Sequence, residues 1–180
     1  ISADLLSKTL KGLYPKVTYV SNITDIDDKI ISAAKDENTS IKEISNKYFK
    51  IYSDDIELLG ITKPDIQPFA TDYIAEMIKY IEKLIKLEKA YEVDGNVLFK
   101  VDTFSNYGCL SGRKIEEQEQ GKRVSIESYK QNENDFILWK PSNNDEPGWN
   151  SPWGNGRPGW HLECSVMSEE TLGVPFDIHG

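Results

Sequence analysis

The spacing of apolar side chains predicts three helices in the first half of the chain. Residues 3–12 place leucines on one helical face, and residues 71–85 repeat apolar side chains at intervals of three, four and seven. Between them, residues 40–59 begin with Ser40 and Glu43 at the spacing of a capping box, whose side chains satisfy free amides at a helix start. We expect the apolar faces of these helices to form core rather than a ligand-binding stripe.

Aromatic and β-branched residues predict strands between and after these helices. Residues 17–23 follow the first helix after a short turn and, together with it, are typical of half a βαβ unit. Residues 91–93 and 97–101 flank an Asp-Gly pair, which predicts a hairpin with a tight turn. A further short strand is expected at residues 136–139.

The last part of the chain combines irregular and regular segments. Residues 140–159 are rich in Pro, Gly and Asn, a composition that predicts an irregular connection. A short helix is expected over residues 165–172, and another strand is expected to start at residues 176–178. The whole pattern predicts an α/β protein that is α/β at both ends and mostly helical in the middle.

Length and composition fit one folded domain, or a domain that carries an insertion. The chain has 180 residues, of which 38% are hydrophobic, so it can bury a core. Its formal net charge of −9 argues against a protein that coats phosphates over its whole surface. Acidic residues at 116–119 interrupt the most concentrated basic stretch, which we interpret as a solvated loop. That stretch comprises Arg113, Lys114, Lys122 and Arg123.

The sequence gives no indication of a membrane or secreted protein. Its apolar runs fall short of the roughly 20 residues that a membrane span needs. Residues 1–10 lack the basic and apolar regions of a signal peptide. The two cysteines, Cys109 and Cys164, lie in unlike surroundings, which favours a reduced, cytoplasmic protein over a disulfide scaffold. We interpret Cys109, in a loop, as incidental.

The first cluster with chemical potential follows the strand predicted at residues 17–23. Thr24 lies just beyond its end, and Asp25, Asp27 and Asp28 come next. In open α/β sheets, ligands bind outside the carboxyl ends of strands. The three carboxylates suit a hard metal ion, or else Asp27 and Asp28 cap the next helix. We favour the cap, because such metal sites use six or more oxygen ligands and no further ones cluster nearby.

A second cluster, residues 156–165, holds an aromatic ring, an imidazole, a carboxylate and a thiol within five positions. His161 and Cys164 suit metal ligation or a thiolate activated by the imidazole, whereas a lone cysteine is more often a small buried apolar residue. Two ligands do not complete a four-ligand zinc site. A third candidate, His179, sits at the end of the last expected strand, as Thr24 does for the first.

Around these residues the chain resembles the cysteinyl-tRNA synthetase family of class I aminoacyl-tRNA synthetases. Residues 19–30 are similar to its YVxNxTDIDDKI segment, and residues 136–140 to its DFxLWK segment. Residues 147–156 resemble EPxWxSPWGxG, residues 156–167 resemble GRPGWHxECSxM, and residues 176–180 resemble the opening of FDIHGGGxD. These blocks follow the family order over nearly the whole chain, and GWHxEC is the most specific of them.

The resemblance implies a fold and an activity. The implied fold is a partial Rossmann-like nucleotide-binding core, residues 1–30 and 155–180, without its first strand. A mostly helical connective insertion with a small β element, residues 31–154, interrupts that core. Family members use ATP, with magnesium, to form cysteinyl-adenylate, and then transfer cysteine to the terminal adenosine of the tRNA for cysteine.

The resemblance also implies residue roles. The family binds zinc through two Cys, one His and one Glu, and the substrate thiolate becomes a further ligand; zinc thereby favours cysteine over serine. Cys164 matches one of the two thiolate ligands. Thr24, Trp160 and His179 match positions of the cysteine pocket, as an amino-group partner, an apolar wall and a polar orienter. His161 matches no zinc ligand of the family.

Parts of the family pattern are not found in this sequence. Both ends look cut, since the HIGH-type motif and the first zinc cysteine are expected before Ile1, and the zinc His and Glu and the KMSKS-type loop after Gly180. We therefore expect no catalytic residue within the chain, weak or no zinc binding, and no activation of cysteine by the chain alone. Two alternatives stay open: a related cysteine ligase of mycothiol biosynthesis, and a non-catalytic module that binds an RNA or a protein through residues 31–154.

Overall fold

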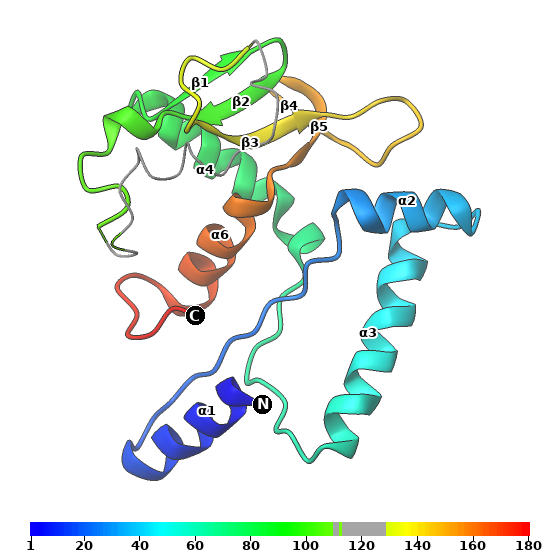
Figure 1. The fold of residues 1–180 in the computed structure, drawn as a ribbon, viewed down its shortest axis with the longest axis vertical. Coiled ribbons are helices and arrows are strands. Elements are labelled where there is room, and N and C mark those ends of the chain that lie inside the picture. The colour runs from blue at the N-terminus through cyan, green and yellow to red at the C-terminus, as the bar shows by residue number, and fades with distance from the viewer. Residues whose placement is uncertain (110–111, 113–128) are drawn as a thin grey trace. The chain divides into compact units, whose positions relative to one another are not determined.

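A computed structural model describes residues 1–109, 112 and 129–180 (Figure 1). The chain divides into two compact units: Ile1–Ile74 with Glu163–Gly180 form unit 1, and Ala75–Leu162 form unit 2. The basic stretch interpreted as a solvated loop lies outside the described residues. Among the described helices, none has the length and apolar character needed to cross a membrane.

Unit 1 is helical, and its first three helices begin close to where the sequence predicts. It contains α1 (Ser2–Leu13), α2 (Asp28–Asp36), α3 (Ile41–Leu58), the 3-10 turn η1 (Ala70–Tyr73) and the later part of α6 (Trp160–Leu172). The capping box that opens α3 is confirmed, because Ser40 accepts a hydrogen bond from the Glu43 amide and the Glu43 side chain accepts one from the Ser40 amide. Buried Ile31, Ala34 and Ile44 line the neighbouring faces of α2 and α3.

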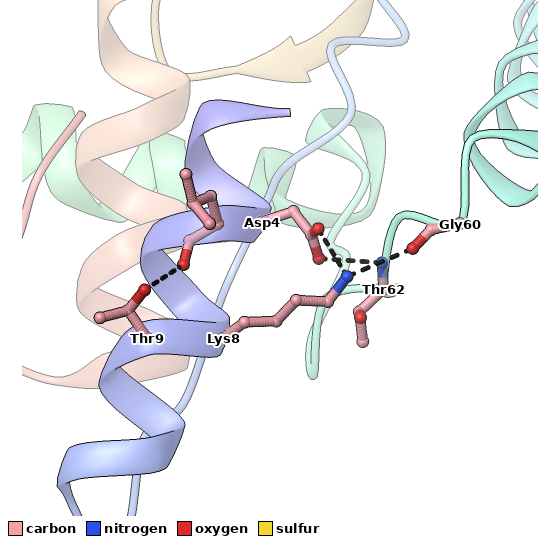
Figure 2. Close-up of polar contacts among 6 residues, drawn as sticks. Asp4, Lys8, Thr9, Gly60 and Thr62 are labelled. Carbon is pink, nitrogen blue, oxygen red and sulfur yellow. Dashed lines mark hydrogen bonds and ion pairs between the residues drawn. The ribbon is translucent and has the colours of Figure 1, made fainter.

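Helix α1 is held against the loop that follows α3 by a small polar cluster (Figure 2). The Asp4 carboxylate accepts a hydrogen bond from the Thr62 amide at 2.9 Å. Lys8 donates both to Asp4, at 2.8 Å, and to the carbonyl of Gly60, at 3.2 Å. The contacts to Gly60 and Thr62 join residues more than 50 positions apart, so they fix α1 in tertiary structure although its leucines are largely exposed.

The strand predicted at residues 17–23 is only partly formed. The segment is extended, but it makes two isolated parallel bridges, Val20 with Ile66 and Ile23 with Phe69, instead of a continuous ladder. Proline has no backbone N–H, so Pro68 can accept a hydrogen bond from Ile23, at 2.8 Å, but cannot donate one to the ladder. The composition of the partner segment therefore limits the pairing.

Unit 2 is built on an antiparallel sheet with the strand order β1-β2-β3-β5-β4. Its strands are β1 (Ala90–Val93), β2 (Asn96–Phe99), β3 (Phe136–Pro141), β4 (Trp149–Ser151) and β5 (Gly154–Pro158), and the short η2 (Val101–Thr103) follows β2. The predicted hairpin is confirmed, with Asp94 and Gly95 both at positive φ in its two-residue turn. The chain is thus a mixture of helices and an antiparallel sheet.

Helix α4 (Ile74–Lys86) contributes buried residues to the core of unit 2. It continues directly from η1, so the helix predicted over residues 71–85 is confirmed with a 3-10 first turn. Figure 1 shows α4 running along one face of the sheet. Met77 and Ile81 on α4 are fully buried, as are Val97, Leu98 and Trp139 of the sheet, and these side chains form the core.

The irregular connection predicted over residues 140–159 is found only at residues 142–148, because β4 and β5 form a hairpin over residues 149–158. Gly154, at a φ of 105°, follows the turn, and Asn150 pairs with Asn155. The glycines of this segment permit close contact rather than irregular structure. A Cβ added at Gly156 would lie 2.4 Å from Trp139 Nε1 and 2.5 Å from the Lys140 carbonyl oxygen.

Two further predictions near the C-terminus need correction. The helix expected over residues 165–172 starts earlier, at Trp160, so the whole GWHLEC motif enters or adjoins α6. The strand expected at residues 176–178 is not formed, and within the described part of the chain no segment pairs with it. An apolar pattern alone does not make a strand without a partner for its backbone.

Candidate functional site

A hydrogen bond between Thr24 and Glu163 marks the candidate site of unit 1. Thr24 follows the extended segment at Ile23, and Glu163 lies in the first turns of α6. The Thr24 hydroxyl donates to Glu163 Oε2 at 3.2 Å. Glu163 is only 1% exposed, so this acid is buried beside a half-buried hydroxyl. The structure thus places Thr24 next to the residue that precedes Cys164.

The residue after Thr24 is fixed by three hydrogen bonds. Asp25 is 8% exposed, and its carboxylate accepts hydrogen bonds from both the amide and the hydroxyl of Thr71. Its backbone carbonyl accepts one from the Ser45 hydroxyl at 3.1 Å. Helix α3 and the start of η1 therefore hold this part of the chain from both sides, and Thr24 sits on a rigid support.

Burial dominates the electrostatics of Glu163. Removal of the carboxyl from water raises the pKa of Glu163 to about 7, and the nearby Asp25 and Asp27 carboxylates act in the same direction. The hydrogen bond from Thr24 acts in the opposite direction, since it stabilises the charged form. An acid with a pKa near neutrality, hydrogen-bonded to a half-buried hydroxyl, is the kind of arrangement that concentrates at functional sites.

Cys164 lies next to Glu163 on α6 and is exposed. Partial burial of the thiol, followed by the influence of Glu163, raises the pKa of Cys164 above the ordinary value of a thiol. A protonated thiol is a poor nucleophile and a poor metal ligand. Cys164 in this state is therefore not an activated nucleophile, and an electropositive group beside it would be needed to make the thiolate.

The carboxylates after Thr24 cap a helix, as we favoured from the sequence. Asp27 is the N-cap of α2, and its side chain accepts a hydrogen bond from the Ile30 amide at 2.7 Å. Asp28 lies in the first turn of that helix, where a negative charge is stabilised. Within residues 1–109, 112 and 129–180, no group of three or more His, Cys, Asp or Glu side chains is placed to hold a metal ion.

The remaining predicted site residues occupy different surroundings. Trp160 belongs to unit 2 and is 69% exposed, and its ring lies 5.5 Å from that of His161. His161 packs against Phe136 of β3 at 5.2 Å between ring centroids, which is a structural contact. His179 belongs to unit 1, is exposed, and lies 5.9 Å from the Phe176 ring. Thr24 is thus joined by a hydrogen bond to the residue before Cys164, and Trp160 and His161 precede Cys164 on the same helix.

Glu163 is the functional candidate that the sequence did not single out. The apolar pattern predicts a helix that starts at residue 165, which leaves Glu163 in a loop. Once α6 starts at Trp160, Glu163 falls on the face that Leu162, Val166 and Met167 bury. A carboxylate on the buried face of a helix is the signal that would have identified it.

Comparison with known proteins assigns the family. A family model described as tRNA synthetases class I (C) catalytic domain matches residues 1–180. The chain therefore belongs to the class I tRNA synthetase (C) catalytic domain family. This agrees with the resemblance found in its motifs, which run through the whole of the matched range.

Several curated relatives are similar over almost the entire chain. The cysteine–tRNA ligase of Parvibaculum lavamentivorans is 52% identical over 177 residues, which is 98% of this chain and 38% of that ligase. The cysteine–tRNA ligases of Maricaulis maris and Pelagibacter ubique are each 51% identical over 179 residues, again 98% of this chain, and 39% and 40% of those proteins. The chain thus spans about 40% of the length of the relatives it matches.

Proposed function

We propose that this chain is part of a cysteine–tRNA ligase. The observation that carries the proposal is identity of about 50% over 98% of the chain to proteins named as such ligases. The protein would activate cysteine with ATP, supplied with magnesium, and transfer it to the terminal adenosine of the tRNA for cysteine. The same relatives favour tRNA over an aminosugar as the acceptor, and an enzyme over a non-catalytic binding module.

The proposed domain plan follows the family. Residues 1–30 and 155–180 would belong to a Rossmann-like core, and residues 31–154 would form the connective insertion. The extended segment before Thr24 supports this plan. The sheet of unit 2 supplies the small β element expected of the insertion, although its strand β5 extends into residues assigned to the core. We also propose a cytoplasmic location, supported by two cysteines that are both free of disulfides.

Thr24, Trp160 and His179 are proposed to bind the cysteine substrate. Thr24 has the strongest structural support, because its hydroxyl is already held in place by Glu163. The exposed indole of Trp160 is available as an apolar wall. The exposed imidazole of His179 is available as a polar orienter. No residue of this chain is assigned to a chemical step.

Cys164 is proposed as one zinc ligand of the complete protein. A four-coordinate zinc site needs three more ligands, and among the described residues no group of three or more His, Cys, Asp or Glu is placed to supply them. When bound, zinc would supply a centre that holds the substrate thiol as thiolate and so favours cysteine over serine.

The activity is tested by ATP–pyrophosphate exchange with the full-length protein and with this 180-residue chain side by side. We expect exchange with cysteine but not with serine for the full-length protein, and no exchange for the chain alone. Absence of cysteine-dependent exchange in the full-length protein would overturn the proposed function. Exchange by the chain alone would overturn our view that the catalytic motifs lie outside it.

The zinc proposal is tested by elemental analysis of matched variants. Cys164→Ser in the full-length protein should lose most of its zinc, because one thiolate ligand is removed. Cys109→Ser is the matched control, since it removes the other exposed thiol of the chain and should keep its zinc. Equal zinc in both variants would refute the role of Cys164, and stoichiometric zinc on the 180-residue chain would refute the expected dependence on further ligands.

A further inference from the structure

Glu163 is a buried acid to which the proposed function gives no role. It is 1% exposed, and its Oε2 is the acceptor for the Thr24 hydroxyl at 3.2 Å. The two residues lie 139 positions apart in the sequence, so the fold brings them together rather than the local chain. A buried carboxylate that contacts a proposed substrate-binding side chain is a candidate for control of that side chain.

The direction of this hydrogen bond decides what Thr24 can offer to a ligand. A threonine hydroxyl has one proton to donate and two lone pairs that accept. In the structure the proton is directed to Glu163, so the lone pairs are the part of the hydroxyl left for a ligand. The ammonium group of an amino acid only donates hydrogen bonds. The hydroxyl is therefore oriented in the sense that an ammonium group requires.

The surroundings leave little freedom for this pair to reorganise. Asp25, the next residue, is tied to Thr71 and Ser45, so the backbone at Thr24 cannot readily turn the hydroxyl elsewhere. On α6, Glu163 lies on the buried face that also carries Leu162, Val166 and Met167. Both partners are thus positioned before any ligand arrives, which is the condition for a preorganised contact.

We propose that Glu163 is a positioning residue that fixes the Thr24 hydroxyl as a hydrogen-bond acceptor for the substrate ammonium group. Through Thr24, and without contacting the ligand itself, Glu163 would favour thiol ligands that also carry an amino group. This inference rests on the proposed function, because it takes Thr24 as part of the cysteine pocket. A purely structural role, in which the bond only joins α6 to the segment before α2, predicts no such selectivity.

The experiment compares ligands with and without an amino group on the full-length protein. Cysteamine carries the thiol and the ammonium, whereas 3-mercaptopropionate carries the thiol and lacks the ammonium. Inhibition of cysteine-dependent pyrophosphate exchange by each compound is measured for the wild type, Glu163→Gln, Thr24→Val and the double variant. Ser168→Ala is the matched control, because it removes one side-chain hydrogen bond on the same helix, to the carbonyl of Ser165, away from the Thr24–Glu163 pair.

We expect Glu163→Gln to raise the KM for cysteine and the inhibition constant of cysteamine by about tenfold, the usual weight of one hydrogen bond to a charged group. The KM for ATP and the inhibition constant of 3-mercaptopropionate should change less than about twofold, since neither involves the ammonium group. The double variant should be no worse than Thr24→Val, because Glu163 acts through Thr24. The control Ser168→Ala should change both inhibition constants by less than about twofold.

Several outcomes would overturn the inference. If Glu163→Gln raises the inhibition constants of both compounds equally, or raises the KM for ATP as much as the KM for cysteine, the Thr24–Glu163 bond is structural. If it further weakens cysteamine in the Thr24→Val background, the Glu163 charge acts on the ligand directly. Should Glu163→Gln not accumulate in folded form, Glu163→Met fills a similar volume without the carboxylate and carries the same comparison. If the wild type shows no cysteine-dependent pyrophosphate exchange, the proposed function is overturned as well. If the wild type is active but Glu163→Gln affects the two compounds alike, only this inference is overturned.

Discussion

The hydroxyl of Tyr91 donates a hydrogen bond to Asp135 at 2.8 Å and so links β1 to the residue that precedes β3. The same Asp135 carboxylate accepts hydrogen bonds from the amides of Val101, at 3.0 Å, and Asn132, at 3.2 Å. Asp135 is 1% exposed. A buried carboxylate with three donors around it thus organises the edge of the sheet in unit 2, independently of the candidate site.

Replacement of Asp135 by Ala should destabilise unit 2 strongly. The variant leaves buried donors without an acceptor, and we expect the free energy of unfolding to fall by about 3 kcal/mol. Urea denaturation followed by tryptophan fluorescence reports on this unit, since all four tryptophans lie within Ala75–Leu162. Glu88→Gln, which alters an exposed acid of the same unit, is the control and should change little. Equal stability of the two variants would contradict the anchoring role of Asp135.

The stability of unit 2 should also depend on alkaline pH through Tyr91. Burial, together with the neighbouring Asp135, raises the pKa of Tyr91 to about 12, whereas a tyrosine of an unfolded chain titrates near pH 10. Below pH 10 both states keep the proton and the contribution to stability is complete. As the pH rises from 10 through about 12, the unfolded state loses the proton first, so stability falls.

This pH dependence can be separated from that of other groups by Tyr91→Phe. Between about pH 9 and about pH 11, the melting temperature of the wild type should fall further than that of the variant. A phenylalanine side chain has no proton to lose, and all other titratable groups are the same in both proteins. A matched decrease in both proteins would show that Tyr91 does not hold its proton in the folded state.

Gly159, which directly precedes α6, should not tolerate a side chain. An added Cβ would lie 2.0 Å from the carbonyl oxygen and 2.8 Å from the carbonyl carbon of Ile137 in β3. Because these are backbone atoms between paired strands, Gly159→Ala must displace the end of the sheet, at a cost of about 3 kcal/mol. Denaturation followed by far-UV circular dichroism measures the effect.

Gly12→Ala is the matched substitution with the opposite expected sign. Gly12 lies in α1 and has open space at its Cβ position, so alanine should stabilise the helix by about 0.5–1 kcal/mol. If Gly159→Ala were as well tolerated as Gly12→Ala, the close approach to Ile137 would not be a constraint in solution.

The thiol of Cys164 should react slowly with alkylating agents in the folded 180-residue chain. Its pKa is raised by partial burial and by Glu163, and only the thiolate reacts. In a Cys109→Ser background, the pH midpoint of the iodoacetamide reaction should lie above that of the same chain in concentrated urea. A midpoint at or below the unfolded value would show that the folded environment does not disfavour the thiolate.

Features set by neighbours in the sequence were predictable. The cap of α2 by Asp27, the capping box of α3 and the Asp94–Gly95 hairpin each depend on a few consecutive residues. The motifs likewise pointed to the family that comparison then showed. Local chemistry of this kind can be read without knowledge of the tertiary partners.

Features set by distant contacts were not predictable from the sequence. Gly154 and Gly156 look like loop residues, yet both lie in β5. Gly154 adopts a φ of 105°, and Gly156 leaves room for the bulky Trp139 of β3. Residues 176–178 have a strand composition but no pairing partner among the described residues. Glu163 is buried on a face of α6, and the apolar pattern predicts the start of that helix too late to include Glu163. The ligand roles of Trp160, His179 and Cys164 remain proposals.

The discontinuity of unit 1 has a consequence for biosynthesis. Ile1–Ile74 are synthesised before unit 2, but the Thr24–Glu163 bond cannot form until Glu163 has been synthesised, after all of unit 2. Unit 2 is a single uninterrupted stretch, so it can fold as soon as its last residues appear. A nascent chain stalled within β5 would therefore possess most of the helices of unit 1 and most of the sheet, yet lack the acid that orients Thr24. The candidate site therefore depends on a tertiary contact that no portion of this chain ending before Glu163 can make.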